Sequence, residues 1–254
     1  MLMKDKVVLV TGGAAGIGKA TALRFAEEGA KVVICDLNEA AGQETLSLLG
    51  ADAAFYKVNV ANRAEVQAWV DAVATKFGHI DVLVNNAGLS RGLDRVQAGS
   101  HVDWDEMIDT NLKGLLWVTR AVLPGMVERD RGHVINVGSV AGHQVYQGGN
   151  VYCATKHAVR ALTQGLRLDL LGTRVRCSTV DPGMVQTEFS EVRFHGDHER
   201  AAAVYRSFPP LQPADVAEAI VFCATRPPHV NVQELLLMPQ DQAAVYGSHP
   251  RGVD

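Results

Sequence analysis

The sequence predicts an α/β fold in which helices cover both faces of one doubly wound parallel sheet, giving three layers, α/β/α. Three observations predict it. Short apolar runs rich in β-branched residues alternate with longer segments of helical periodicity, the order expected of parallel βαβ units. A glycine-rich turn joins the first run to a helix at residues 11–18. Polar residues also follow several of the apolar runs directly, and the carboxyl ends of parallel strands are where ligands bind.

The composition is that of an ordinary globular protein. Of the 254 residues, 47% are apolar and 20% are charged, and the net charge is −4. This charge gives no basic footprint for a nucleic acid, and no apolar run reaches the roughly 20 residues of a membrane span. The four cysteines lack metal-ligand spacing, so we expect no metal site and a cytoplasmic protein with reduced thiols. We expect a single domain over residues 1–254.

The first third of the chain contains four expected strands and two expected helices. Each apolar run is short and is bounded by turn-forming residues, which is typical of strands between turns. We expect strands at Lys6–Val10, Lys31–Cys35, Ala53–Val60 and Asp81–Val84, and helices at Lys19–Glu28 and Arg63–Phe77.

The rest of the chain continues the alternation. Asp103, with Glu106 three residues on, forms a capping-box pattern that predicts the start of a long helix. We expect helices at Asp103–Glu128, Val151–Leu171 and Pro213–Thr225, and strands at Gly132–Gly138, Arg174–Val180 and Glu234–Met238.

The glycine-rich turn has the sequence TGGAAGIG over Thr11–Gly18. It lies between an expected strand and an expected helix, as in a Rossmann-type dinucleotide site. Glycines allow a tight turn and close approach of the backbone to a pyrophosphate, which binds the N–H groups at the start of the helix. The turn therefore predicts a dinucleotide cofactor.

Asp36 ends the second expected strand and lies 18 residues after Gly18. An acidic residue about 20 residues after the glycines binds the ribose 2′-hydroxyl in this type of site. The carboxylate would repel a 2′-phosphate, and Leu37 and Asn38 add no positive charge. We therefore expect NAD rather than NADP. The alternative is that Asp36 caps the helix that follows.

Tyr152 and Lys156 are four residues apart within an expected helix. Every fourth residue of this segment is apolar, which gives the helix one buried stripe: Ala154, Ala158, Leu162, Leu166 and Leu170. One turn apart, the phenol and the ammonium are neighbours. Because an ordinary phenol has a pKa near ~10, an adjacent positive charge would bring it toward working pH for acid–base catalysis.

In combination, these motifs resemble the short-chain dehydrogenase/reductase family over essentially the whole chain. The matching segments, in the family's order, are Thr11–Gly18, Asn85–Gly88, Asn111, Ser139, Tyr152–Lys156 and Pro182–Thr187. The resemblance implies an oxidoreductase that moves a hydride between a nicotinamide and a hydroxyl or carbonyl carbon.

The resemblance also implies roles for individual residues. Tyr152 would exchange a proton with the substrate oxygen, and Ser139 would donate a hydrogen bond to that oxygen. Lys156 would lower the pKa of the tyrosine and hold the nicotinamide ribose, while Asn111 would position a water that relays protons. The residues expected to bind the cofactor are Gly12, Ala15, Gly16, Ile17, Gly18, Asp36, Leu37, Asn59, Val60, Asn86, Ala87, Gly88, Tyr152, Lys156, Pro182, Gly183, Val185 and Thr187.

Segments between residues 88 and 247 are similar to one subgroup of the family, the 3-hydroxy acid dehydrogenases. Examples are DWDEMIDTNLKGL and PGMVQTEFSEVRFHGD. The subgroup includes enzymes that act on serine, L-allo-threonine and 3-hydroxyisobutyrate. It typically has basic residues after the second strand and uses NADP, whereas this chain carries Asp36. A second departure is Asn59, where the family usually has Asp.

A 3-hydroxy acid needs a cationic partner for its carboxylate. Arg193 is the candidate, because arginine binds carboxylates bidentately; the alternative is that it is solvated or contacts another subunit. It lies in a segment, residues 186–212, with the length and position of a substrate lid. We expect Ser139, His143 and Tyr146 to contact the substrate as well.

Three functions remain open from the sequence. The first is an NAD-dependent dehydrogenase of small 3-hydroxy acids or β-hydroxy amino acids. The second is an NADH-dependent reductase of neutral ketones or aldehydes on the same fold. The third is a non-catalytic NAD sensor, against which the intact catalytic residues argue. The expected helices at residues 103–128 and 151–171 resemble the family's subunit interface, so we expect a homotetramer.

Overall fold

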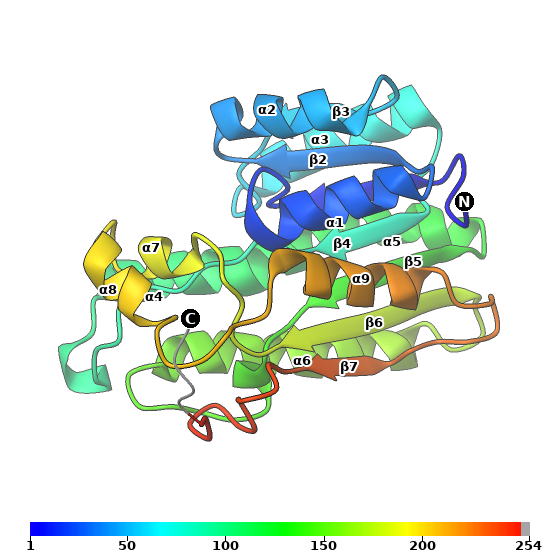
Figure 1. Ribbon diagram of the computed structural model, residues 1–254. Helices are drawn as coiled ribbons and strands as arrows, with labels where there is room; N and C mark the ends of the chain where they lie inside the picture. The colour runs from blue at the N-terminus through cyan, green and yellow to red at the C-terminus, as the bar shows by residue number, and fades with distance from the viewer. Residues whose placement is uncertain (250–254) are drawn as a thin grey trace.

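The computed structural model describes residues 1–249 and confirms a single-domain α/β fold of the Rossmann type (Figure 1). Its sheet has seven strands in the order β3-β2-β1-β4-β5-β6-β7, and every pairing is parallel. The strands are β1 (Val7–Thr11), β2 (Lys31–Asp36), β3 (Ala54–Lys57), β4 (Val82–Asn85), β5 (Gly132–Val137), β6 (Val175–Pro182) and β7 (Glu234–Leu237). Residues 250–254 of the expected domain lie outside the described residues.

Helices cover both faces of the sheet. On one face α1 (Gly16–Glu27), α2 (Glu39–Leu49) and α9 (Pro213–Ala224) pack on the strands, and the opposite face carries α3 (Arg63–Phe77), α5 (Leu115–Glu128) and α6 (Asn150–Asp169) (Figure 1). The central strands are buried on both sides, because each face meets an apolar helix stripe. The remaining helices, α4 (His101–Ile108), α7 (Phe189–Arg193) and α8 (His198–Ala203), lie beyond the carboxyl edge of the sheet (Figure 1).

The long helix expected over residues 103–128 is divided in the structure. A π-helical segment, η2 (Asp109–Gly114), separates α4 from α5. The expected capping box is also absent, since the Ser100 side chain accepts the N–H of Asp103 and caps α4. Periodicity alone did not reveal these features, because an extra residue in one helical turn changes neither composition nor hydrophobicity.

Three of the described α-helices, α2, α7 and α8, were not among the sequence-based expectations. Helix α2 follows β2 and is capped by Asn38, whose side chain accepts the N–H of Ala41. Asp36 is therefore not the cap of this helix. Helices α7 and α8 are only five and six residues long, too short for a periodic pattern to show them.

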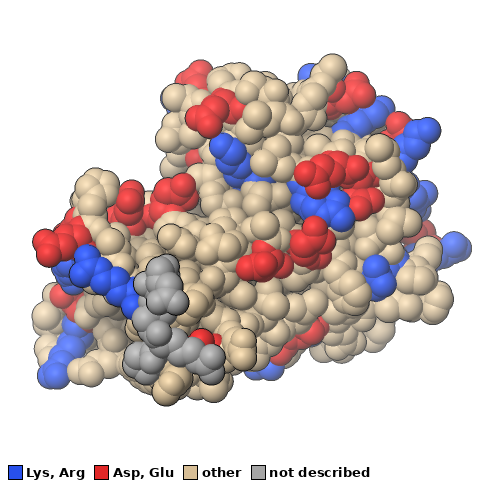
Figure 2. Space-filling view, in the orientation of Figure 1, with Lys and Arg blue, Asp and Glu red and all other residues tan. Residues whose placement is uncertain are grey.

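Charged side chains are interspersed on the face that carries α1 and α9 (Figure 2). Part of this pattern is an ion-pair cluster in which Arg24 of α1 binds Glu28, with 2.8 Å between Nη2 and Oε1, and Glu218 of α9, with 2.6 Å between Nε and Oε1. Among the described helices, none is long and apolar enough to cross a membrane.

A buried chain of amide and hydroxyl groups connects the sheet to α5 and α6. The Asn85 Nδ2 donates to Thr119 Oγ1 on α5 and to Asn136 Oδ1 on β5, each at 2.9 Å. The Asn136 Nδ2 in turn donates to Thr163 Oγ1 on α6 at 2.8 Å. Because these groups are shielded from water, each depends on its partner in the chain.

Asn136→Ala tests this chain of hydrogen bonds. The substitution removes the central amide and leaves buried donors and acceptors without partners, so we expect the free energy of unfolding to fall by about 2–4 kcal/mol. Chemical denaturation with urea measures it. A loss below about 0.5 kcal/mol, the range of ordinary surface substitutions, would show that the chain contributes nothing beyond packing.

Candidate active site

A cavity of about 590 Å³ opens at the carboxyl ends of β1, β2, β4, β5 and β6. It brings together most of the residues that the sequence predicted for cofactor binding and catalysis. Those that line it are Gly12, Ala15, Gly16, Ile17, Asp36, Leu37, Asn59, Val60, Asn86, Ala87, Gly88, Ser139, Tyr152, Lys156, Pro182, Gly183, Val185 and Thr187. The predicted residues outside the lining are Gly18, Asn111, His143, Tyr146 and Arg193.

The glycine-rich turn between β1 and α1 has no room for side chains at two positions. A Cβ on Gly18 would lie 1.9 Å from the carbonyl oxygen of Gly12, and one on Gly12 would lie 3.0 Å from Ala87 Cα. Gly12 also has a φ of +64°, a conformation that favours glycine. No side chain caps the start of α1. The turn therefore leaves an open backbone cradle and N–H groups that fit the pyrophosphate of a dinucleotide.

Two side chains hold the backbone around this cradle. The Asn86 Nδ2 donates to the carbonyl oxygens of Thr11 and Gly12, at 2.9 and 3.0 Å. The Asp36 Oδ2 accepts the N–H of Ala14 at 3.1 Å, and its Oδ1 accepts the N–H of Asn38 at 3.0 Å. Asp36 thus ties the end of β2 to the glycine-rich turn.

Lys156 is buried beside the end of β5. Its Nζ donates to the carbonyl oxygen of Val137 at 2.9 Å and lies 5.9 Å from the centre of the Tyr152 ring. Burial lowers the pKa of Lys156 to about 8, and the negative charge of Asp181 opposes this shift. The ammonium is therefore placed between the sheet and the phenol, and it can lose a proton at mildly alkaline pH.

The environment of Tyr152 combines opposing influences on its pKa. Burial raises the pKa, whereas the positive charge of Arg193 and a hydrogen bond with Ser139 lower it. The guanidinium carbon of Arg193 lies 5.6 Å from the centre of the Tyr152 ring. Burial outweighs the other influences, so the pKa of Tyr152 lies above the ordinary value of a phenol. The sequence assigned a lowering of this pKa to Lys156, but the groups that lower it are Arg193 and Ser139.

Asn111 lies behind the cavity in the π-helical segment η2. Its Oδ1 accepts the N–H of Leu89 at 2.8 Å, and its Nδ2 donates to the Leu89 carbonyl at 2.8 Å and to Thr155 Oγ1 at 3.1 Å. A Cβ on Gly88 would lie 3.2 Å from Asn111 Oδ1 and 3.7 Å from Lys156 Nζ. Asn111 therefore joins the β4 loop to α6 beside Lys156, and its role in a water relay stays a prediction.

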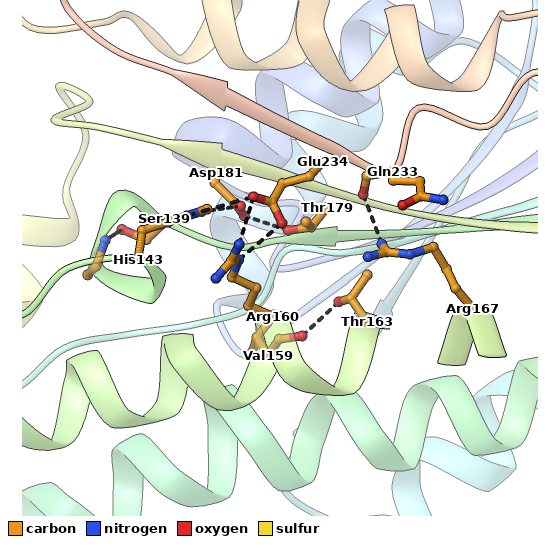
Figure 3. Close-up of polar contacts among 11 residues, drawn as sticks. Ser139, His143, Val159, Arg160, Thr163, Arg167, Thr179, Asp181, Gln233 and Glu234 are labelled. Carbon is orange, nitrogen blue, oxygen red and sulfur yellow. Dashed lines mark hydrogen bonds and ion pairs between the residues drawn. The ribbon is translucent and has the colours of Figure 1, made fainter. Parts of the chain in front are cut away.

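The structure does not bring His143 to the cavity. Its Nε2 lies 2.7 Å from Asp181 Oδ2, and its Nδ1 lies 3.7 Å from Glu234 Oε1 (Figure 3). The Arg160 guanidinium also donates a hydrogen bond to the Glu234 carboxylate, with 3.0 Å between Nε and Oε2. His143, Asp181 and Glu234 are close enough together to hold a metal ion. Because Glu234 also pairs with Arg160, we interpret His143, Asp181 and Glu234 as part of a polar network rather than as a metal site.

Tyr146 and Arg193 contact each other beside Tyr152. The Arg193 Nη2 donates to the Tyr146 hydroxyl at 3.0 Å. Burial raises the pKa of Tyr146, so its hydroxyl stays neutral. The Tyr246 ring packs edge-on against the Tyr146 ring, with 6.3 Å between centroids. Tyr146 thus positions the arginine.

Some residues of the cavity were not anticipated from the sequence. They come from the loop after β4, from α4 and η2, and from α7: Leu89, Glu106, Asp109, Thr110, Glu188, Phe189 and Val192. Glu106 was noticed in the sequence, but it was interpreted as part of a capping box rather than as a residue of the cavity. The apolar residues carry no local signal, because phenylalanine and valine are equally typical of a core.

A comparison with known protein families identifies the family to which this chain belongs. The family model described as short chain dehydrogenase matches residues 6–197. The chain belongs to the short-chain dehydrogenase family. This confirms the resemblance drawn from the motifs.

Relatives of this dehydrogenase include two named 3-hydroxy acid dehydrogenases. The NADP-dependent 3-hydroxy acid dehydrogenase YdfG of Salmonella typhi is 48% identical, over 93% of this chain and 96% of the relative. The NADP-dependent 3-hydroxy acid dehydrogenase of Schizosaccharomyces pombe is 40% identical, over 94% and 95%. A solved closed form of serine dehydrogenase, complexed with NADP⁺, superposes with a TM-score of 0.91 at 44% identity and covers 98% of both chains.

The expectation of NAD as the cofactor is wrong. Both relatives are named NADP-dependent, and the solved serine dehydrogenase is a complex with NADP⁺, so the comparisons point to NADP. The expectation rested on the spacing and charge of Asp36. In the structure, both of its carboxylate oxygens accept backbone N–H groups. This carboxylate therefore has a structural reason to be present that does not depend on the ribose.

Tyr152→Phe tests the acid–base role of the phenol. The substitution removes the only group that would exchange the proton and keeps the ring, so we expect kcat to fall by about 10²- to 10⁴-fold. The dissociation constant for the dinucleotide, measured by fluorescence titration, should stay within a few-fold of wild type. Turnover within tenfold of wild type would refute the role.

Proposed function

We propose that this dehydrogenase oxidises small 3-hydroxy acids or β-hydroxy amino acids with NADP⁺ and reduces the corresponding oxo acids with NADPH. The names of the relatives support this substrate class and this cofactor. The observation that carries the proposal is the position of Arg193, whose guanidinium lies over the ring of Tyr152. We also propose a cytoplasmic homotetramer, which the exposed apolar side chains of Leu116 on α5 and Leu168 on α6 support.

Arg193 has unused donor capacity beside the catalytic tyrosine. Its Nη2 donates to Tyr146, but its buried Nε has no hydrogen-bond partner among the described residues. Its guanidinium also lies against the ring of Phe189, with 5.1 Å to the centroid. Arg193 is half-buried, but a buried donor without a partner is costly, and a substrate carboxylate would satisfy it bidentately. A carboxylate bound here would place a 3-hydroxyl group near the phenol of Tyr152.

The residues of the cavity can then carry out the proton transfers of the reaction. A nicotinamide held by the cavity would supply the hydride acceptor for oxidation of the hydroxyl-bearing carbon, and the hydride donor for the reverse reaction. Tyr152, as phenolate, takes the hydroxyl proton, while Ser139 donates a hydrogen bond to the same oxygen. Lys156 offers its positive charge beside the phenol and beside the ribose end of the cavity. The glycine-rich turn and Asn86 keep the cofactor cradle in place.

A second candidate is reduction of neutral ketones or aldehydes. The apolar wall formed by Leu89, Phe189 and Val192 favours it, because such a wall accepts a neutral substrate without desolvating a charge. The two candidates differ in the requirement for Arg193.

Arg193→Ala tests the carboxylate site. Loss of a charge-assisted hydrogen bond of about 1.5–3 kcal/mol should lower kcat/KM for 3-hydroxyisobutyrate, serine and L-allo-threonine by roughly 10- to 100-fold. Because Arg193 lowers the pKa of Tyr152, its removal should also move the rise of kcat/KM for oxidation to higher pH. Initial rates with NADP⁺ across a pH series measure both effects.

Exposed Arg206, in the same segment, provides the matched control as Arg206→Ala. Neutral secondary alcohols of the same size should lose far less activity than the acids in Arg193→Ala. An equal loss for acids and neutral alcohols would contradict carboxylate binding and favour the second candidate.

Asp36→Asn tests the position of the adenosine end of the cofactor. With NADP⁺ bound, the Asp36 carboxylate at the cavity wall faces further negative charge, and neutralisation removes a repulsion of about 1 kcal/mol or more. We expect the dissociation constant for NADP⁺ to fall about tenfold in a fluorescence titration. Asp52→Asn, on an exposed loop, is the control. An unchanged constant would place the 2′-phosphate away from Asp36.

A further inference from the structure

The C-terminal end of α7 is attached to the loop that follows β4. The guanidinium of Arg91 donates from Nη1 to the carbonyl oxygen of Val192. The N–H of Gly92 donates to the carbonyl oxygen of Arg193 at 2.9 Å. His195, directly after the helix, also lies 3.3 Å from Asp103 at the start of α4. Three contacts therefore join the predicted lid to the opposite wall of the cavity.

These contacts matter because α7 cannot be stable alone. A helix of five residues is far shorter than the roughly 12–15 residues at which an isolated helix becomes marginally stable. The N–H of His195 is a local partner of the Val192 carbonyl, but at a long 3.3 Å, and the Arg193 carbonyl is the last of the helix. Arg91 and Gly92 supply partners for the carbonyls of Val192 and Arg193, and a cation at a helix C-terminus is favourable.

The guanidinium of Arg91 is itself held in one orientation. Its Nε lies 2.7 Å from Glu106 Oε2, and its Nη2 lies 2.8 Å from Glu106 Oε1, so the pair is bidentate. The hydrogen bonds with Glu106 raise the pKa of Arg91, and those with Arg91 lower the pKa of Glu106. The Arg91 side chain is only 18% exposed. With two N–H groups fixed by α4, the remaining nitrogen is aimed at α7.

The contact of Arg91 affects the substrate site because Val192 and Arg193 are adjacent in the chain. Val192, whose carbonyl is held, precedes Arg193, whose side chain lies over Tyr152. Glu106 and Val192 both line the cavity, and the Arg91 guanidinium neutralises the Glu106 carboxylate there. Without Arg91, α7 would lose one of its contacts with the loop after β4. The Glu106 carboxylate would also keep an unpaired negative charge, which would repel an anionic substrate.

We propose that Arg91, fixed by Glu106, is a positioning residue that clamps the end of α7 over the cavity and thereby places Arg193 for the substrate carboxylate. The proposal rests on the proposed 3-hydroxy acid function for its effect on substrate. Its effect on the lid itself does not depend on the substrate. If α7 is held in place before the substrate binds, less conformational entropy is lost on binding, and the free energy of binding is more favourable.

Arg91→Ala in the full-length protein tests the clamp with two measurements. Hydrogen–deuterium exchange without substrate should show the amides of Val192, Phe194 and Gly196 exchanging at least about tenfold faster than in wild type. KM for 3-hydroxyisobutyrate should rise about tenfold with a much smaller change in kcat, and KM for a matched neutral alcohol should change little. Exposed Arg95, in the same loop, provides the control as Arg95→Ala.

Two further variants separate the clamp from the charge of Glu106. In Arg91→Ala combined with Glu106→Gln, the acid is neutral but α7 is still unclamped, so both effects should persist. Return of the exchange rates or of KM to wild-type values would overturn the proposal. Arg91→Lys keeps a positive charge but cannot bridge Glu106 and Val192 with a planar fork, so it should lie between wild type and Arg91→Ala.

The exchange measurement also separates this proposal from the proposed function. If wild type shows no preference for carboxylated substrates, the function fails while the exchange rates still test the clamp. If wild type prefers the acids and the exchange rates of Arg91→Ala equal those of Arg95→Ala, the clamp fails and the function stands.

Discussion

The hydrogen bond from Lys156 Nζ to the carbonyl oxygen of Val137 sets the geometry on which the site depends. Val137 ends β5, and the sheet fixes its carbonyl through the pairing of β5 with β6. A buried amine must be satisfied, so this bond sets the position of α6 along the strand. Tyr152 precedes the lysine by one helical turn, and Ser139 follows Val137 by two residues. One contact between a helix and a strand therefore brings the hydroxyl, the phenol and the ammonium to the same edge of the sheet.

The two cations beside the phenol, Lys156 and Arg193, differ in their counter-charges. Asp181 acts on Lys156 from the end of β6, and its carboxylate is in turn held by Thr179 Oγ1 and His143 (Figure 3). No acid pairs with the Arg193 side chain among the described residues. That asymmetry is one reason for proposing that Arg193, rather than Lys156, binds a substrate carboxylate.

Most of the fold could be predicted because its signals are local. The strands that the sequence indicated appear with ends shifted by a few residues, and α3 has the predicted bounds, Arg63–Phe77. Helical periodicity placed the Tyr152–Lys156 pair on one helix, but the predicted buried stripe was largely wrong, since Ala154 is exposed. The buried residues of α6 are Tyr152, Cys153, Thr155, Lys156, Val159 and Thr163. The failures involve contacts between distant residues. Ser100 rather than Asp103 caps α4, and His143 turns toward β6 and β7. Asp36, interpreted as a cofactor selector, binds two backbone amides instead.

The substrate end of the cavity is the part that local patterns describe least, and there is a physical reason for this. Its residues lie on short helices and loops whose conformations depend on tertiary contacts, such as those of Arg193 with Tyr146 and of Val192 with Arg91. A short element of this kind can move when one distant contact changes, while the sheet and Tyr152 remain in place. Substrate choice can therefore change on this fold without altering its chemistry. The proposed substrate class therefore depends on the contacts of α7 rather than on the Tyr152–Lys156 pair.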